Sequence, residues 1–455
     1  MEEIQGPGYR IIVDDKAVIP QWNEETRTLS TPRLYLELDA KFSLAGERIA
    51  GLLLPPLKAY SDSLEEVINT YRKRVVAEQA ADLVSRLGPL TAEARVEASF
   101  FPASRAYMLW STLGCLIGDA INSDETVSAY LEHASVAGVV EGGLVKVKPR
   151  RYREYIVSNI RKLQLKTLGM AGNVARYMGR IGRMTLNYCI STPEAPDPSR
   201  HVRLPEGRFH YECPGPRELA RYYLGVVESC KRSQWTSSTV ICRGEKGDRV
   251  AVKEYLRMIV KWLPASIASS PALNYLITPK SRLANEYRHL RVLRSVIPTP
   301  RILGVCGDPT KAVMVREFAE GEPVLDSDKP LYWRMSGEAL ATIHGHGYVL
   351  GDPNPGNFVI DGDTVGLVDA EQARGFTARR GAWDLIVYVY YSVLLGKRGD
   401  LIVEGLRGYL DGIGALRDEV VRELGDKRLW NWLRILPVQY RRAREVFSGV
   451  GIELT

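Results

Sequence analysis

A proline-dense stretch near the middle of the chain constrains what this sequence can fold into. Six prolines fall within the 24 residues from 193 to 216, where average usage would give about one. Proline fixes φ and lacks a backbone donor, so this stretch cannot be helix interior or a central strand. We therefore expect a linker or extended connection at 193–216 that divides the 455-residue chain. At about 100–200 residues per domain, the length suggests two to four domains.

The overall composition is that of an ordinary globular protein. Hydrophobic residues make up 45% and charged residues 25% of the chain, which excludes a disordered, collagenous or low-complexity protein. Lysine and arginine number 61 against 54 acidic residues, so the net charge is +7. A charge this small on a chain of this length permits an anionic partner without requiring one.

The cysteines and the hydropathy pattern indicate a reducing, cytoplasmic setting. Six cysteines are scattered with no Cys-x-x-Cys spacing, which argues against a disulfide framework and against a zinc ribbon. The start of the chain, MEEIQGPGYR, is acidic and polar, unlike a secretory signal. No uncharged apolar run reaches about 18 residues, so we expect no membrane span. Ala106–Gly118 and Leu385–Gly396 are interpreted as buried helices.

The first half of the chain is predicted to be an α/β domain of unknown role, at residues 1–192. Arg33–Asp39 alternates apolar and charged residues, so we expect a half-buried strand there. A long helix is expected to begin with a capping box formed by Ser63 and Glu66 and to stop at Gly88. Neither feature indicates a chemical function.

One segment of this half, Lys146–Arg183, is strongly basic. It carries 11 lysines and arginines against one acid, Glu154, and tyrosines are interleaved with the charges. One interpretation is a surface that contacts the phosphate backbone of RNA, in particular tRNA. The other is a solvated helix face whose charges pair with acids elsewhere in the fold. Both interpretations stay open.

A hairpin is expected in the second half, with polar residues at both of its ends. The short apolar runs Phe358–Ile360 and Val365–Val368 flank Asp361–Thr364, a tight-turn sequence. Asn357 precedes the hairpin and Asp369 follows it, and a hairpin brings its two ends together. An amide oxygen and a carboxylate therefore converge on one point, and oxygen ligands of this kind suit Mg²⁺.

Three further residues complete a group suited to handling phosphate. Asp352 lies just before the hairpin in a loop kept rigid by prolines, where a carboxylate can orient a hydroxyl and accept its proton. Lys253 lies on an expected strand, Arg249–Tyr255, and Glu286 lies on an expected helix, Ser281–Ser295. A lysine on a strand, held by a glutamate on a following helix, presents a fixed cation to phosphates.

In their order and spacing, these residues resemble the protein-kinase-like superfamily over about residues 225–450. Lys253 matches the strand lysine that binds ATP phosphates, and Glu286 matches its helix partner. Asp352 and Asn357 have the catalytic-loop spacing, and Asp369 resembles the metal-binding aspartate. The resemblance implies ATP and Mg²⁺ as cofactors. The implied catalytic residues are Asp352, Lys253 and Glu286, and the implied metal ligands are Asn357 and Asp369.

The resemblance also implies a fold of the α+β class. A bilobal protein-kinase-like domain is expected after the separate α/β N-terminal domain. Its small lobe would be an antiparallel sheet at 217–320, and its helical large lobe would occupy 321–455. Glu317 and Ala319 would belong to the hinge that hydrogen-bonds adenine, and Asp384 resembles the helix aspartate that braces the catalytic loop.

Departures from the common kinase pattern make the chain similar to the atypical members of the superfamily. Leu350–Gly351–Asp352 stands in place of HRD, Asp369–Ala370–Glu371 stands in place of DFG, and there is no GxGxxG loop. The segment after Asp369 is short and contains no APE sequence. The pattern resembles RIO kinases, the small kinase of the tRNA threonylcarbamoylation complex, aminoglycoside, choline and lipopolysaccharide kinases, and the archaeal tRNA 2′-kinase.

The expected function is that of an ATP-dependent phosphotransferase that transfers the γ-phosphate to a hydroxyl on a macromolecule. A protein serine or threonine is the first choice of acceptor. One alternative is an RNA kinase that acts on a tRNA ribose and grips RNA through Lys146–Arg183. The other is a nucleotide-binding scaffold with weak turnover. The missing glycine loop favours this alternative. The presence of suitable residues at the metal-ligand and catalytic-base positions disfavours it.

Overall fold

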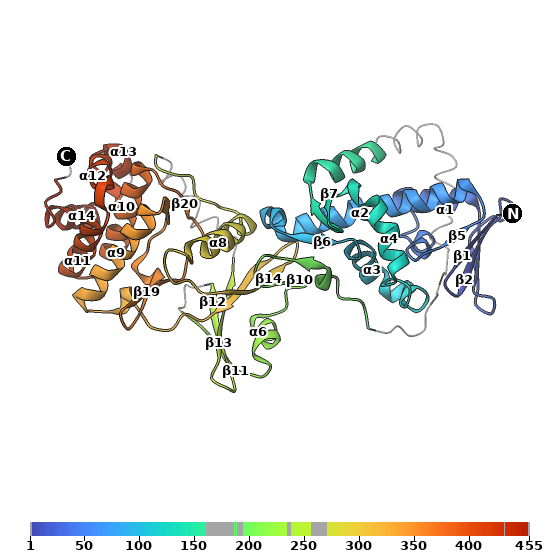
Figure 1. Ribbon diagram of the computed structural model, residues 1–455, viewed down its shortest axis with the longest axis horizontal. Helices are drawn as coiled ribbons and strands as arrows, with labels where there is room; N and C mark the ends of the chain where they lie inside the picture. The colour runs from blue at the N-terminus through green and yellow to red at the C-terminus, as the bar shows by residue number, and fades with distance from the viewer. Residues whose placement is uncertain are drawn as a thin grey trace. The chain divides into compact units, whose positions relative to one another are not determined.

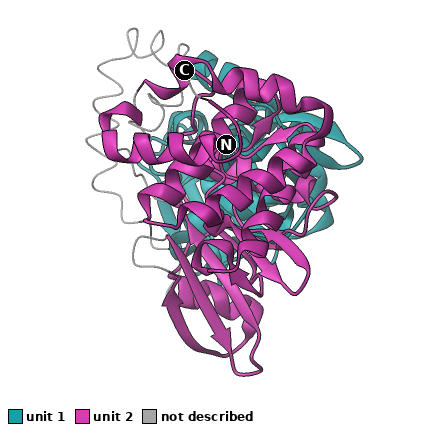
Figure 2. Ribbon diagram, turned by 90° about the vertical axis from the view of Figure 1, so that its left-hand side faces the viewer, with its two compact units in different colours: residues 1–211 teal, residues 212–455 magenta. Residues whose placement is uncertain are grey.

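The structure is a computed structural model that describes residues 2–160, 186, 188, 194–233, 238–255, 271–431 and 433–453. The chain forms two compact units, Met1–Tyr211 and Glu212–Thr455, which Figure 2 shows in different colours. Each unit combines helices with β-sheet, so the chain is a mixed α+β protein. The boundary between the units falls within the proline-rich stretch 193–216.

The first unit contains two sheets. In one, the strand order is β3-β4-β2-β1-β5, with β2 and β4 parallel and the other neighbours antiparallel. Its strands are β1 (Glu2–Gly6), β2 (Tyr9–Val13), β3 (Gln21–Asn23), β4 (Thr28–Thr31) and β5 (Lys58–Ala59). In the other, the order is β10-β9-β6-β8-β7 and all neighbours are antiparallel. Its strands are β6 (Arg95–Glu97), β7 (Gly138–Glu141), β8 (Leu144–Val147), β9 (Val202–Arg203) and β10 (Arg208–His210).

Two long helices pack against each other in the first unit. Helix α2 (Asp62–Leu87) packs against α3 (Phe100–Ile117), and both bury apolar side chains such as Leu83 and Leu113. Helix α3 confirms the buried helix predicted at Ala106–Gly118. Other helices described here are α1 (Arg33–Phe42), α4 (Asp124–His133) and residues 149–160, with 3₁₀ turns η1 (Ala50–Leu53), η2 (Gly88–Ala92), η3 (Ala134–Val136) and η4 (Pro198–His201).

The long helix predicted in this half is α2, and it ends at Gly88, which has a positive φ of 57°. Its start differs from the prediction. The capping residue is Ser61, whose Oγ accepts from the N–H of Leu64, so Ser63 lies inside the first turn. The capping box predicted at Ser63 and Glu66 is wrong, because the spacing alone does not tell which of two nearby serines keeps an extended backbone.

The segment Arg33–Asp39, predicted as a half-buried strand, is the first part of helix α1. Its buried residues lie one, three and four positions apart, as expected for one face of a helix. They are Tyr35, Leu36, Leu38 and Asp39. The strand prediction is wrong, because alternation and helical spacing overlap over so few residues.

The carboxylate of Asp39 organises the turn that follows α1. Its Oδ1 accepts from the N–H groups of Ala45 and Glu47 at 2.7 and 3.2 Å. Its Oδ2 accepts from the N–H groups of Ile49 and Ala50 at 3.1 and 2.9 Å. The side chain is buried. A buried N–H left without an acceptor costs about 1–3 kcal/mol, so these bonds stabilise the unit strongly.

We predict that Asp39→Ala destabilises the first unit by roughly 3 kcal/mol or more, because several buried N–H groups lose their acceptor. Urea denaturation of the full chain measures the effect. Glu24→Ala, at an exposed position of the same unit, is the control. Equal denaturation midpoints for the two variants would contradict the structural role of Asp39.

The proline-rich stretch is more structured than a plain linker. It contains η4, β9 and β10, and the side chains of Val202, Phe209 and Tyr211 are buried. Of the described prolines, Pro198 is the first residue of η4, and Pro205 lies between β9 and β10. Proline is tolerated at the first position of a helical turn because that residue needs no backbone donor. The proposed domain bounds around this stretch stay predictions.

The second unit contains an antiparallel sheet whose order is β11-β12-β13-β15-β14. Its strands are β11 (Val227–Arg232), β12 (Thr239–Gly244), β13 (Arg249–Glu254), β14 (Ile302–Gly307) and β15 (Ala312–Glu317). Helix α6 (Pro216–Leu224) packs on β11, β12 and β13, and α8 (Pro279–Leu293) contacts β15. The predicted strand Arg249–Tyr255 and the predicted helix Ser281–Ser295 are confirmed.

The rest of the second unit is mainly helical (Figure 1). Helix α9 (Pro330–Gly345) packs closely on α11 (Gly399–Gly412). A Cβ on Gly337 would lie 1.8 Å from the Gly405 oxygen, so this contact requires glycine. Helix α10 (Ala378–Leu394) confirms the buried helix predicted at Leu385–Gly396. Among the described helices of the chain, none is long and apolar enough to cross a membrane.

Short strands and further helices complete this part. The strands form the sheets β16-β18-β19 and β17-β20. Their bounds are β16 (Glu322–Pro323), β17 (Tyr348–Val349), β18 (Phe358–Asp361), β19 (Thr364–Leu367) and β20 (Arg374–Gly375). The further helical elements are η5 (Val324–Asp326), η6 (Pro355–Asn357), η7 (Gly414–Leu416), α12 (Arg417–Leu424), α13 (Lys427–Trp430), η8 (Leu433–Ile435) and α14 (Pro437–Ser448).

The second unit contains two disulfide bonds, so the prediction against disulfides is wrong. Cys213 pairs with Cys306, 93 residues along the chain, and Cys230 pairs with Cys242. Cys230 and Cys242 lie opposite each other on β11 and β12. Pairing requires Cα atoms within about 7 Å, and strand register creates that approach without any spacing motif. Disulfides are rare in reducing compartments, so these bonds weigh against the reducing setting expected from the sequence.

Candidate active site

Lys253 and Glu286 form a buried ion pair in the second unit. Lys253 lies on β13, in register with Met314 of the neighbouring strand β15. Its Nζ lies 2.7 Å from Oε2 of Glu286, which α8 carries. The lysine residue is 5% exposed and the glutamate 0%. The strand and helix that sequence patterns predicted therefore bring these two side chains together.

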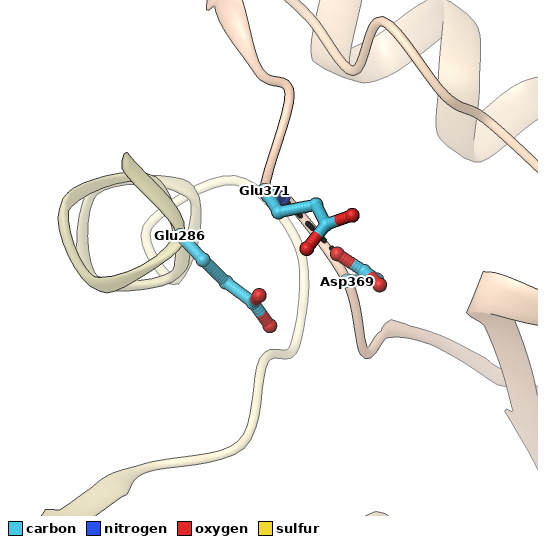
Figure 3. A group of neighbouring side chains, drawn as sticks. All are labelled: Glu286, Asp369 and Glu371. Atoms are coloured by element: carbon cyan, nitrogen blue, oxygen red, sulfur yellow. Dashed lines mark hydrogen bonds between the residues drawn. The ribbon is translucent and has the colours of Figure 1, made fainter. Parts of the chain in front are cut away.

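Asp369 joins the same cluster from a different part of the unit. Its Oδ2 lies 2.7 Å from the Nζ of Lys253. Figure 3 shows Asp369 facing Glu286, with Glu371 beside them. The ligand atoms of these three acids lie within 4.8 Å of one another. The contact between Lys253 and Asp369 thus joins residues 116 positions apart in the sequence.

The predicted hairpin is confirmed as β18–β19, with Phe358 opposite Leu367. The N–H of Val368 donates to the carbonyl of Asn357 at 2.9 Å, which extends the pairing by one step. Asn357 and Asp369 therefore lie at the same end of the hairpin. The Nδ2 of Asn357 donates to the carbonyl oxygen of Asp352 at 3.1 Å, so the hairpin end is tied to the preceding loop.

The loop that carries Asp352 is held by Asp384 of α10. The Asp384 carboxylate accepts from the N–H groups of Leu350 at 2.7 Å and Gly351 at 2.8 Å. Its Oδ2 also lies 3.1 Å from Nε2 of His344, which is fully buried near the end of α9. The two oxygens of one carboxylate thus bind consecutive N–H groups of this loop.

Tyr275 holds the loop from the other side. Its hydroxyl donates to the carbonyl of Gly351 at 2.6 Å, and the indole N–H of Trp383 lies 3.1 Å from the same hydroxyl. Gly351 has a φ of +75°, and a Cβ there would lie 2.8 Å from the Gln372 carbonyl oxygen. Glycine is therefore required immediately before Asp352.

The charges of the cluster stabilise one another. Burial acts to lower the pKa of Lys253, but Asp369, Glu286 and Glu371 outweigh it and raise that pKa. Burial acts to raise the pKa of Asp369, yet Lys253 holds it below its ordinary value. Burial raises the pKa of Glu286 and that of Glu371. The Lys253–Asp369 pair therefore stays ionised at neutral pH.

Several residues of the cluster were missed by sequence reasoning. Arg316 of β15 lies 2.7 Å from Oε1 of Glu286 and also donates to the carbonyl of Val368. The hydroxyl of Tyr255 donates to Glu286 at 2.6 Å. A further pair, Arg282 and Glu371, is buried beside Lys253. One sequence feature does point to such residues: a charged residue inside an otherwise apolar periodic segment, such as the arginine in VMVRE.

The remaining predicted residues lie elsewhere. Glu317 is the last residue of β15, and its carboxylate is 2.6 Å from Nη2 of Arg301. Ala319 lies two residues later and is partly buried. Their adenine-binding role stays a prediction. Of the basic segment Lys146–Arg183, residues 146–160 are described, and residues 161–183 lie outside the described part of the chain.

Comparisons with known proteins show a remote likeness to solved structures. No family model matches the chain, and no curated protein sequence matches it. Among solved structures, the chain is similar to an aminoglycoside phosphotransferase from Alicyclobacillus acidocaldarius subsp. acidocaldarius. The identity is 13%, the TM-score is 0.35, and the match covers 52% of this chain and 96% of the other.

We predict that Asp384→Asn lowers the free energy of unfolding of the second unit by about 2–4 kcal/mol. In the variant, the amide nitrogen would face a backbone N–H that donates to the carboxylate of Asp384 in the unmodified chain. Urea denaturation should show the loss, with Asp400→Asn, whose side chain is 58% exposed, as the control. A midpoint as high as that of the control would show that Asp384 does not brace the loop.

Proposed function

We propose that this chain is an ATP-dependent phosphotransferase of atypical kinase type, with its site in the second unit. The observation that supports this best is the buried Lys253 ammonium, 2.7 Å from both Glu286 and Asp369. A lysine anchored on two sides offers a fixed positive charge to phosphates. Phosphoryl transfer relies mainly on such positioning and electrostatic stabilisation, because there is little covalent chemistry for the protein to perform.

The donor groups at the hairpin end fit Mg²⁺. Asp369 offers a carboxylate and Asn357 an amide oxygen, and Mg²⁺ prefers oxygen ligands of this kind. The amide nitrogen of Asn357 is engaged with the Asp352 carbonyl, so its oxygen is the ligand atom. When bound, Mg²⁺ would neutralise and orient the phosphates.

Asp352 is proposed to orient the acceptor hydroxyl and to accept its proton. In this step the acceptor oxygen forms a bond to the γ-phosphorus, and the bond from that phosphorus to the β–γ bridging oxygen breaks. ADP leaves with the electron pair, and the hydroxyl proton passes to Asp352. The backbone of Glu317 and Ala319 is proposed to hydrogen-bond adenine.

The acceptor is proposed to be a protein serine or threonine. It would belong to the chain itself or to a partner that residues 1–215 dock. Incubation with labelled ATP and Mg²⁺, alone and with cell extract, identifies the molecule that takes the label.

We predict that Asp369→Asn and Asp352→Asn each reduce phosphoryl transfer by about 10³-fold or more. The first loses a metal ligand and the second loses the proton acceptor. EDTA should abolish transfer by the unmodified chain. Asp361→Asn, in the exposed turn of the same hairpin, is the matched control and should retain activity. Full transfer by the Asp369 variant would refute the metal assignment.

An RNA acceptor is the second candidate function, and the surface of the first unit favours it. Lys148, Arg151 and Arg153 are all exposed, while Arg150 is 2.8 Å from Glu154. The described part of the basic segment thus presents several cations to solvent, as a phosphate-binding surface requires. A tRNA ribose hydroxyl would then be the acceptor.

For this second candidate, we predict that tRNA binding weakens about 20- to 40-fold between 50 and 200 mM salt if three phosphates are contacted. Replacing Lys148, Arg151 and Arg153 by glutamine should weaken binding and flatten the salt dependence. The control neutralises three exposed cations in or beside the first sheet of the same unit, Arg10, Lys16 and Lys58. A flat salt profile, or equal binding by both triple variants, would remove RNA as the acceptor.

A further inference from the structure

Glu371 is a third carboxylate beside Lys253. Its Oε2 lies 3.6 Å from the lysine Nζ and 3.3 Å from Nη1 of Arg282. Its side chain is 8% exposed, and that of Arg282 is 6% exposed. Figure 3 shows Glu371 directed toward the same region as Asp369. Glu371 is thus buried directly beside the Lys253–Asp369 contact, where it can support that contact.

The backbone around Glu371 is bonded to helix α8. The Glu371 N–H donates to Oδ1 of Asp369 at 3.0 Å. The Nδ2 of Asn285 donates at 3.0 Å to the carbonyl of Glu371 and at 3.0 Å to that of Ala373. Arg282 and Asn285 lie on one side of α8, so the helix holds both the side chain and the backbone of this segment. The segment after Asp369 is thereby tied to the helix that carries the lysine partner Glu286.

The charges of this region balance. Three cations face three carboxylates, and all six belong to the second unit. They are Lys253, Arg282 and Arg316 on one side, and Glu286, Asp369 and Glu371 on the other. Removing one member of a buried pair leaves an uncompensated charge, whereas removing both members of a pair costs less. The Arg282–Glu371 pair can therefore be tested by single and double neutralisation.

We propose that Glu371 and Arg282 are positioning residues for phosphoryl transfer, and that their pairing holds the Asp369 carboxylate in register with Lys253. This inference rests on the proposed function. The pair acts through the segment that carries Asp369, and displacement of a reacting constellation by about 1 Å can cost about 100-fold in rate. The direct contact between Lys253 and Glu286, which anchors the phosphate-binding cation, includes neither member of the pair. The pair should therefore affect the transfer step more than nucleotide binding.

The test compares Glu371→Gln, Arg282→Gln and the double variant in the full-length chain. Steady-state assays with ATP and Mg²⁺ give kcat and KM, and thermal unfolding reports on the fold. Each single variant should lower kcat by about 10–100-fold, as supporting contacts around metal sites commonly do. The KM for ATP should change by less than about threefold. The double variant should be no worse than either single variant, because the two residues act as one unit.

The matched control neutralises an exposed arginine–carboxylate pair in the same unit, Arg398 and Asp400, whose side chains are 66% and 58% exposed. Its kcat should equal that of the unmodified chain. If Glu371→Gln does not fold, the double variant, which leaves no unpaired charge of this pair, carries the comparison. The inference would be overturned if kcat is unchanged in the folded variants, or if the fold-loss in kcat of the double variant equals the product of the two single losses. Either result would leave the proposed function intact. No ATP turnover by the unmodified chain would overturn the proposed function and this inference with it.

Discussion

The second unit is organised around the ion pairs that the buried ammonium group of Lys253 forms with carboxylates. A lysine that is only 5% exposed cannot stay charged unless carboxylates surround it. Those carboxylates come from α8 and from the segment after β19, so satisfying one charge draws a helix and a hairpin onto strand β13. The electrostatic requirement of a buried cation thus fixes the spatial relation of three elements that are far apart in the sequence.

Each unit also contains a buried aspartate whose carboxylate accepts hydrogen bonds from several backbone N–H groups. Asp39 holds the turn after α1, and Asp384 holds the loop that carries Asp352. In each case a helix supplies the carboxylate, and an irregular segment supplies donors that have no partner in regular structure. The loop of Asp352 is therefore rigid for a reason that is separate from the proposed chemistry. A fixed loop is what a base needs if it is to meet an acceptor hydroxyl in one geometry.

Much of the site could be predicted because its parts have strong local signals. The hairpin between Asn357 and Asp369, the strand of Lys253 and the helix of Glu286 each follow from the period of apolar residues or from turn residues. The partners Arg282, Arg316 and Glu371 could not be found in this way. Charged residues on helices and strands are usually solvated, and only packing shows that these three are buried, Arg282 against Glu371 and Arg316 against Glu286.

The sequence by itself determined where α2, α3, α8, β13 and the β18–β19 hairpin lie, because each depends on residues adjacent in the chain. The tertiary structure alone decided the helical state of Arg33–Asp39, whose short pattern fits two periods, and the start of α2 at Ser61. It also decided the pairing of Cys230 with Cys242 and of Arg282 with Glu371. Those contacts depend on strand register and on the approach of distant segments, and local periodicity carries no information about either.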